Sequence, residues 1–254
     1  MDPLDSSDGS FLFRNFADVC ERIKATSKKL EKVRILSSYL QTLDRDTLPI
    51  VSRFLSGIIF QKGSKKEVYI GYSTLIDLIF EISGIDQRGF EATYLKYGDL
   101  GSTAEELFDK KALLPVIKRE LKLIDVYQEF EKMASITGKR AVEGRKSILR
   151  GLLLDASPAE AKYLIKILTG ELRIGLTEGL VEEAIAKAFN YEIKEIKKAQ
   201  LVIGDVGTTA LLAFERRIHE AKLKLMQPLS YMLADTMSSA TEIEQYYKKE
   251  LYAE

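Results

Sequence analysis

The chain has 254 residues, enough for one large domain or two modest ones, and it is 46% hydrophobic and 30% charged, as is typical of a globular protein with a substantial core. Its 38 lysines and arginines balance 38 aspartates and glutamates, so no net charge draws the whole molecule to nucleic acid or membrane, and anion binding must come from local clusters and oriented backbone groups. The single cysteine, Cys20, excludes an internal disulfide, and no apolar run approaches the roughly 20 residues of a membrane span, so we expect a cytoplasmic protein without membrane contact.

The first half of the sequence predicts a series of helices after a polar lead-in at residues 1–10, which we expect to be flexible. Apolar residues recur at steps of three and four over 13–26 and 27–43, with Ser27 as the expected cap of the second helix. Further helical segments follow at 45–60, 73–84 and 86–98, closed by glycine or a polar break. Only EVYIGY, residues 67–72, alternates like a strand.

The second half continues the same pattern. Ser157, followed by Pro158 and Glu160, has the spacing of a capping box, and Thr177 precedes another helix start. The predicted helical segments are 123–135, 143–156, 157–170, 177–190, 191–204 and 208–224. We therefore predict an all-α fold of about a dozen helices, and a turn repeated in the two halves favours two pseudo-symmetric lobes.

That repeated turn is GDLGSTA at 98–104 and GDVGTTA at 204–210. Asp99 and Asp205 fit best as helix caps, and the glycines allow positive φ and bring the backbone to the surface. The following Ser or Thr hydroxyls and amides lie at a helix N-terminus, which favours an anion, so the two turns could hold two stretches of phosphate backbone. The alternative is a tight interhelical turn that needs small residues for packing, and the sequence leaves both interpretations open.

Two basic segments are further candidates for anion binding. In GELRIGLTEG, residues 170–179, Arg173 lies between glycines and could reach a phosphate or a groove edge, or could instead cap a neighbouring helix. In TGKRAVEGRKSILR, residues 137–150, five basic residues accompany one acid, Glu143, which fits either phosphate contact or an ordinary solvated face. The sequence has no Walker loop, metal-ligand cluster or nucleophile–histidine set, and we expect no catalytic centre, metal or cofactor in this segment.

Together these segments resemble the N-terminal DNA-binding domain of archaeal and eukaryotic-type ATP-dependent DNA ligases. The matching pieces run in family order and include FLSGIIF, YGDLGSTAEELF, LTGELRIGLTEGLVEEAIAKA and QPLSYMLAD, of which the third is the most specific. The resemblance implies an all-α domain over residues 11–230 that grips the minor-groove face of nicked double-stranded DNA. It also implies that 231–254 is a linker toward an adenylation domain.

The resemblance assigns DNA-binding roles to the repeated turns and the RIG loop, and the basic segment is added from its charge. The candidate residues are Gly98, Gly101, Ser102, Lys139, Arg140, Arg145, Lys146, Arg173, Gly175, Thr177, Gly204, Gly207 and Thr208. In the family the lysine that takes AMP follows shortly after the position of Glu254, so we expect DNA binding here without nick sealing. ATP and Mg²⁺ would serve the parent enzyme in replication, repair and recombination, in the cytosol of an archaeon or the nucleus of a eukaryote.

Some positions depart from the family pattern. Gly138-Lys139-Arg140-Ala141 stands where the family usually has Gly-x-Gly-Ser, and Tyr231 replaces a proline. A sliding clamp is a possible partner, although the clamp peptide of some archaeal members is not recognisable in AEELFDKKALL, and nothing in the sequence indicates an obligate oligomer, so we expect a monomer. The competing hypotheses are an α-helical protein-interaction scaffold without DNA affinity and a different, hairpin-based DNA-repair binder.

Overall fold

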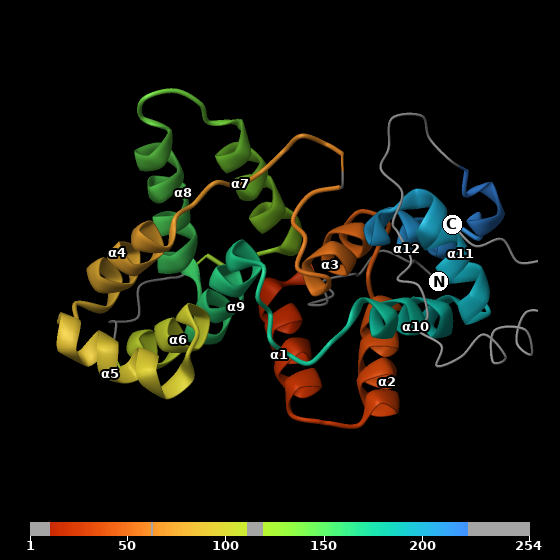
Figure 1. Cartoon of the computed structure of the whole chain (residues 1–254), viewed down its shortest axis with the longest axis horizontal. Coiled ribbons are helices and arrows are strands. Elements are labelled where there is room, and N and C mark those ends of the chain that lie inside the picture. The colour runs from red at the N-terminus through yellow and green to blue at the C-terminus, as the bar shows by residue number, and fades with distance from the viewer. Residues whose placement is uncertain (1–10, 62, 111–118, 223–254) are drawn as a thin grey trace, which may run out of the picture.

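The computed structural model describes residues 11–61, 63–110 and 119–222 (Figure 1). Within these residues the chain is all-α, with twelve α-helices, one 3₁₀ turn and no β-sheet, which confirms the predicted fold class. The helices are α1 (Phe13–Lys24), α2 (Lys29–Leu40), α3 (Thr47–Leu55), α4 (Tyr72–Ser83), α5 (Gln87–Tyr97), α6 (Leu100–Lys110), α7 (Leu123–Ser135), α8 (Ala141–Asp155), α9 (Pro158–Thr169), α10 (Glu178–Phe189), α11 (Ile193–Ile203) and α12 (Val206–Phe214). The predicted lead-in at 1–10 and linker at 231–254 lie outside the described residues.

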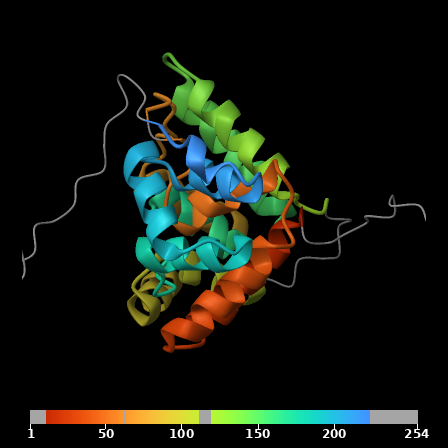
Figure 2. The same cartoon turned by 90° about the vertical axis from the view of Figure 1, so that its right-hand side faces the viewer.

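The molecule has two lobes, and each lobe takes helices from both halves of the sequence. In Figure 1, α1–α3 lie with α10–α12 in one lobe, and α4–α9 form the other. In the first lobe α2 packs on α10 and α3 on α12; in the second, α8 packs on α4 and α9 on α6. Figure 2 shows the same contact of α2 with α10 from the side. Each half of the sequence therefore contributes three helices to each lobe.

The two halves repeat one six-helix plan. Helices α1–α6 correspond in order to α7–α12: α4 and α10 have 12 residues each, and α5 and α11 have 11 each. The packing repeats as well, because α1 contacts α9 and α7 contacts α3. An isolated antiparallel bridge joins Leu12 to Lys122, where the two halves begin. The predicted pseudo-symmetry is thus present in both order and packing.

Most helix boundaries follow from local signals. Ser157 and Glu160 form the predicted capping box, and left-handed glycines with φ of 66–71° end α4, α5, α9 and α11. Ser27 does not cap α2: the Thr26 hydroxyl instead accepts a hydrogen bond from the Lys28 backbone N–H.

Two predicted segments differ from the structure. EVYIGY is not a strand; Val68 and Ile70 pack against the core, so the alternation is real, but no strand lies beside it in the described chain. The last predicted helix ends at Phe214, because Arg216 turns to a φ of 62° and the Arg217 N–H bonds back to the Leu212 carbonyl.

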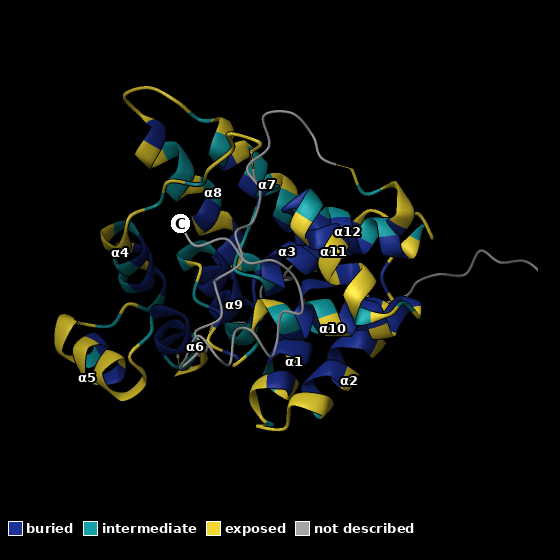
Figure 3. Ribbon diagram, turned by 45° about the vertical axis from the view of Figure 1, so that its right-hand side comes forward, coloured by how far each residue is buried: buried dark blue, intermediate teal, exposed yellow. Residues whose placement is uncertain are grey.

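An aromatic cluster joins the lobes. Phe16 of α1 packs edge-on against Phe54 of α3 and Tyr163 of α9, with ring centroids 6.1 Å apart in each pair, and Phe54 meets Phe130 of α7 at 6.0 Å. These rings are fully buried, and Figure 3 shows buried residues on the facing sides of the helices. Phe16 and Phe54 belong to one lobe and Phe130 and Tyr163 to the other, so the packing of these rings fixes the lobes relative to each other. No described helix could cross a bilayer by its length and hydropathy.

Candidate nucleic-acid interface

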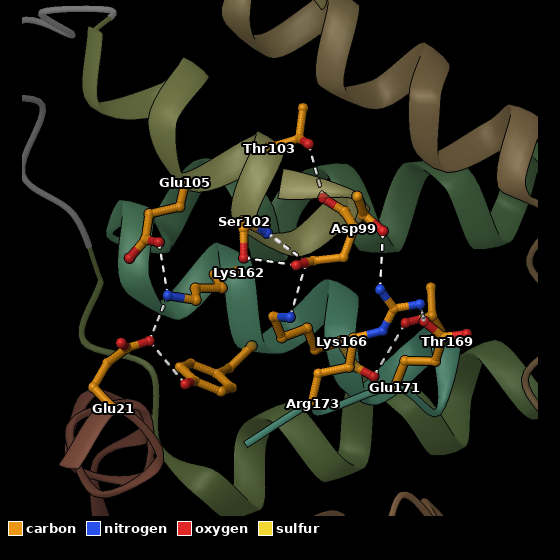
Figure 4. Close-up of polar contacts among 12 residues, drawn as sticks. Glu21, Asp99, Ser102, Thr103, Glu105, Lys162, Lys166, Thr169, Glu171 and Arg173 are labelled. Atoms are coloured by element: carbon orange, nitrogen blue, oxygen red, sulfur yellow. Dashed lines mark hydrogen bonds and ion pairs between the residues drawn. The ribbon is translucent and has the colours of Figure 1, made fainter. Parts of the chain in front are cut away.

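The first repeated turn, Gly98–Ala104, joins α5 to α6 and is built around a capping aspartate (Figure 4). Asp99 accepts hydrogen bonds from the Ser102 backbone N–H and hydroxyl, both at 2.8 Å, and pairs with the buried Lys166 ammonium of α9 at 2.8 Å. Burial alone would raise the pKa of Asp99, but the bonds from Lys166 and Ser102 outweigh it and hold that pKa below its usual range. The turn is therefore tied to α9 by charge.

The second glycine of this turn is a packing residue. A Cβ on Gly101 would lie 2.6 Å from the backbone oxygen of Lys162, so α6 and α9 approach as closely as a glycine allows. Lys162 extends the contact: its buried ammonium pairs with Glu105 at 2.8 Å and with Glu21 of α1, which also accepts from the Tyr163 hydroxyl (Figure 4).

The second repeated turn, Gly204–Ala210, repeats this construction between α11 and α12. Asp205 accepts from the Thr208 N–H at 2.8 Å and hydroxyl at 2.7 Å, and Arg53 of α3 forks onto its carboxylate at 2.8 and 3.0 Å. Complete burial would raise the pKa of Asp205, but Arg53 and Thr208 hold it below its usual range. A Cβ on Gly207 would lie 2.6 Å from the Pro49 oxygen.

The expectation that both turns expose their backbone is wrong for most of their residues. The predicted cap roles of Asp99 and Asp205 are confirmed, but Gly101, Ser102, Gly204 and Gly207 are buried, Thr208 is half-buried, and the Ser102 and Thr208 amides are engaged by the caps. The physical reason is the pairing of α6 with α9 and of α3 with α12, which covers the second glycine of each turn. Gly98 is exposed, at a φ of 66°.

The loop between α9 and α10, Gly170–Thr177, is called the Arg173 loop here. Its Arg173 side chain contacts the first repeated turn. Its guanidinium donates to the Gly98 carbonyl at 3.0 Å and pairs with Glu171 at 2.5 Å, yet its side chain is 52% exposed (Figure 4). Its φ of 49° is left-handed, which is uncommon for a residue other than glycine. Two predicted site segments distant in sequence thus form one surface with an accessible cation.

The rest of the Arg173 loop is held from below. The buried ammonium of Lys32 in α2 donates to the carbonyls of Ile174 and Gly175 at 2.8 and 2.9 Å, and a Cβ on Gly175, whose φ is 64°, would lie 2.6 Å from that nitrogen. Thr177 is exposed at the N-cap of α10, and its side chain makes no capping bond, so its hydroxyl is available.

The Arg173 loop also meets the connection between α3 and α4. A Cβ on Gly57 would lie 3.1 Å from the Gly170 oxygen, so the two glycine turns touch. A hollow of about 370 Å³ lies between Leu55–Gly57 and Gly170–Leu176, and Glu178 also lines it. Glu178 accepts from Gln200, whose carbonyl accepts from Thr209, which links this hollow to the second turn.

Several side chains of the basic segment, residues 137–150, are held by contacts within the protein and are not available to an anion. Arg145 donates to the carbonyls of Met133, Ile136 and Tyr69, so it acts as a structural clamp, and Lys146 lies 3.9 Å from Glu81, which Arg150 also holds. Lys139 and Arg140 are exposed at the start of α8, and neither has an ion-pair partner among the described residues. The accessible cations among the predicted site residues therefore form two separate groups, Arg173 in its loop and Lys139 with Arg140 at the start of α8.

Sequence reasoning missed Arg53 and Lys166, the cations that hold the two aspartates. A signal was present: Arg53-Phe54-Leu55-Ser56-Gly57 and Lys166-Ile167-Leu168-Thr169-Gly170 are a second repeated motif, basic–apolar–Leu–Ser/Thr–Gly. Each partner of a capping aspartate thus lies four residues before a left-handed glycine. In the described part of the chain, no group of His, Cys, Asp and Glu side chains could hold a metal ion.

A family model described as DNA ligase N terminus matches residues 12–186, and the chain belongs to this family. Similar proteins include a "Probable DNA ligase" of Koribacter versatilis, 37% identical over 89% of this chain and 38% of its own length. The DNA ligases of Methanoculleus marisnigri and Archaeoglobus fulgidus are 33% and 31% identical over 92% and 90% of this chain. Because the alignments cover only 43% and 42% of those two proteins, the chain spans well under half of each relative's length.

Proposed function

We propose that this chain is the DNA-binding part of an ATP-dependent DNA ligase and that it grips nicked duplex DNA through the phosphate backbone and the minor groove. The observation that carries the proposal is Arg173: a half-exposed guanidinium held over the Gly98 carbonyl, in a chain that belongs to the DNA ligase N-terminus family. A cation placed this way can meet a phosphate without a net positive charge on the molecule.

The contact surface in this proposal is centred on the exposed candidates. Around Arg173 it comprises Gly98, Gly175 and Thr177, and at the start of α8 it comprises Lys139 and Arg140. Gly101 and Gly207 are buried against α9 and α3, so in this proposal they act indirectly, by the close helix packing that positions the two turns. The buried Ser102 and Gly204, with the half-buried Arg145, Lys146 and Thr208, would support these contacts by holding the turns and the start of α8 in place.

For the whole protein we propose nick sealing in replication, repair and recombination. The parent would use ATP to adenylate a lysine, transfer AMP to a 5′-phosphate and release AMP as the 3′-hydroxyl attacks. In this proposal Mg²⁺ and ATP serve the catalytic chemistry of the parent enzyme. A sliding clamp is a proposed partner of the parent, and the segment in which a clamp peptide would be expected, AEELFDKKALL, lies partly outside the described residues.

Equilibrium binding to nicked, intact and single-stranded DNA over a salt series tests the proposal. We expect a preference for nicked duplex and an affinity that falls steeply with salt, because phosphate contacts release counterions. Arg173→Glu should weaken binding about tenfold or more, within the range of roughly 1–3 kcal/mol for a lost cation contact.

Arg14→Glu is the matched control. Arg14 also forms an exposed ion pair, with Glu120 at 2.8 Å, but it contacts neither the turns nor the Arg173 loop, so its variant should bind as the unmodified protein does. Absence of DNA binding at low salt would reject the proposal and favour the interaction scaffold. An equal loss of DNA affinity in Arg173→Glu and Arg14→Glu would show that Arg173 makes no specific DNA contact.

A further inference from the structure

Lys32 differs from the other buried lysines of the described chain in what surrounds its charge. The buried lysines there are Lys32, Lys162 and Lys166. Lys162 pairs with Glu105 and Lys166 with Asp99, both at 2.8 Å. Lys32 is only 6% exposed, yet among the described residues it has no carboxylate within ion-pair distance, and its ammonium donates to backbone carbonyls alone. It is therefore a buried positive charge without a counter-ion.

The charge of Lys32 lies directly beneath the Arg173 loop, which runs from α9 to α10 beside α2 (Figure 1). The hydrogen bonds to the carbonyls of Ile174 and Gly175, at 2.8 and 2.9 Å, compensate part of the cost of burying an ammonium. Carbonyl dipoles stabilise the charge but do not cancel it, so a positive potential remains at the loop. The zero net charge of the whole chain makes this a local feature.

The same bonds fix the direction of two backbone amides. The Ile174 carbonyl shares a peptide plane with the Gly175 N–H, and the Gly175 carbonyl shares one with the Leu176 N–H. These peptide bonds are trans, and in a trans peptide the N–H points opposite to the C=O. Both amides therefore point away from the buried ammonium. They lie outside the helices, and neither donates to another group of the described chain.

Other anion-binding groups lie next to these amides. Gly175 and Leu176 line the hollow of about 370 Å³ together with Arg173, whose guanidinium is half-exposed. Thr177 is exposed, and its hydroxyl makes no capping bond. Residues 173–177 thus combine two free amides, a free hydroxyl and an accessible cation, which are groups that hold a phosphate.

We propose that Lys32 is a positioning residue for DNA binding: it aims the Gly175 and Leu176 amides at one backbone phosphate, which supplies the negative charge that its ammonium lacks in the free chain. This inference rests on the proposed DNA binding and adds to it a residue that does not touch DNA. A phosphate on these amides would lie roughly 8 Å from the ammonium, where a unit charge changes affinity by about tenfold or more at an effective dielectric constant of about 20.

The first test compares Lys32→Met with the unmodified chain in equilibrium binding to nicked duplex DNA. Methionine keeps an unbranched side chain and removes the charge, so the variant should stay folded by circular dichroism and bind about tenfold more weakly. Lys187→Met is the matched control, because Lys187 is an exposed lysine in the last turn of α10, at the end of that helix away from the loop. This variant should bind as the unmodified chain does.

Amide NMR of protein with isotope-labelled glycine gives a readout that a merely structural lysine would not change. The Gly175 amide signal should move downfield when nicked duplex is added to the unmodified chain, because its N–H gains a phosphate acceptor. The shift should be absent in Lys32→Met. The signal of Gly151, inside α8, serves as the internal control and should not move in either protein.

Each outcome separates the inference from the proposed function. If Lys32→Met binds like the unmodified chain while Arg173→Glu does not, the inference is wrong and the proposed function stands. A Gly175 amide signal that stays in place while the unmodified chain binds DNA also overturns the inference, and this measurement decides the question if Lys32→Met does not fold. If the unmodified chain shows no affinity for nicked DNA, the proposed function fails together with the inference.

Discussion

Replacing Gly101 by alanine separates a packing glycine from one that merely exposes backbone. Alanine is favoured over glycine inside a helix by about 1 kcal/mol, so an unobstructed change would stabilise α6. At Gly101, however, the new Cβ would lie 2.6 Å from the Lys162 backbone oxygen and 2.7 Å from the Lys166 Cγ. Overpacking typically costs about 1–3 kcal/mol, and a backbone oxygen within α9 can move little, so we expect a net loss of about 2 kcal/mol.

Thermal and urea unfolding followed by circular dichroism measures this effect. For a domain of this size a loss of about 2 kcal/mol lowers Tm by roughly 4–8 °C. Gly151→Ala is the matched control: Gly151 lies inside α8, a Cβ there would meet no atom within 4 Å, and alanine should raise stability by up to about 1 kcal/mol. A Gly101→Ala protein as stable as the parent would refute the close packing of α6 on α9.

Three further predictions concern the buried ion pairs and caps. Arg53→Leu should cost about 3–5 kcal/mol in urea unfolding, because it leaves the Asp205 carboxylate buried and unpaired, whereas Arg45→Leu, which breaks a more exposed pair with Glu215, should cost less than about 1 kcal/mol. The pKa of Asp205 is lower in the folded chain than its ordinary value of 3.8, so its stabilisation is complete above that pH and is lost as the pH falls through the folded value; acid titration of the unfolding free energy should show this loss, and a flat profile below pH 3.8 would contradict it. Ser157→Ala should cost about 1 kcal/mol by thermal unfolding through loss of the capping box, while Ser27→Ala should change nothing, and equal effects would contradict the assignment.

Local patterns predicted the helices because their signals are local. Apolar periodicity, the Ser157 capping box and the terminal glycines identify elements within a few residues of the chain. The last helix was predicted too long because its residues favour helix beyond Phe214, and nothing in the pattern announces the left-handed Arg216. The predicted cap of α2 at Ser27 was also wrong, because the helix begins one residue later, after Lys28, and no side chain caps it.

The arrangement of the site could be predicted only in part. The two aspartates were identified as caps, but their cations come from helices that are distant in sequence, Arg53 for Asp205 and Lys166 for Asp99. Whether a glycine such as Gly101 faces solvent or a neighbouring helix depends on the exchange of helices between lobes, which no local pattern encodes. The contact of Arg173 with the Gly98 carbonyl also depends on the tertiary fold, because the two residues are distant in sequence and only the packing of the helices brings them together.

The exchange of helices also has a consequence for biosynthesis. A nascent polypeptide that has emerged only through α6 holds three helices of each lobe, and the surfaces of α2 and α3 that later pack on α10 and α12 are still uncovered. Such long-range pairing delays folding until the remaining helices leave the ribosome, and partly exposed apolar faces are prone to aggregate meanwhile. Separately expressed halves should therefore be poorly behaved alone and should regain structure when they are mixed.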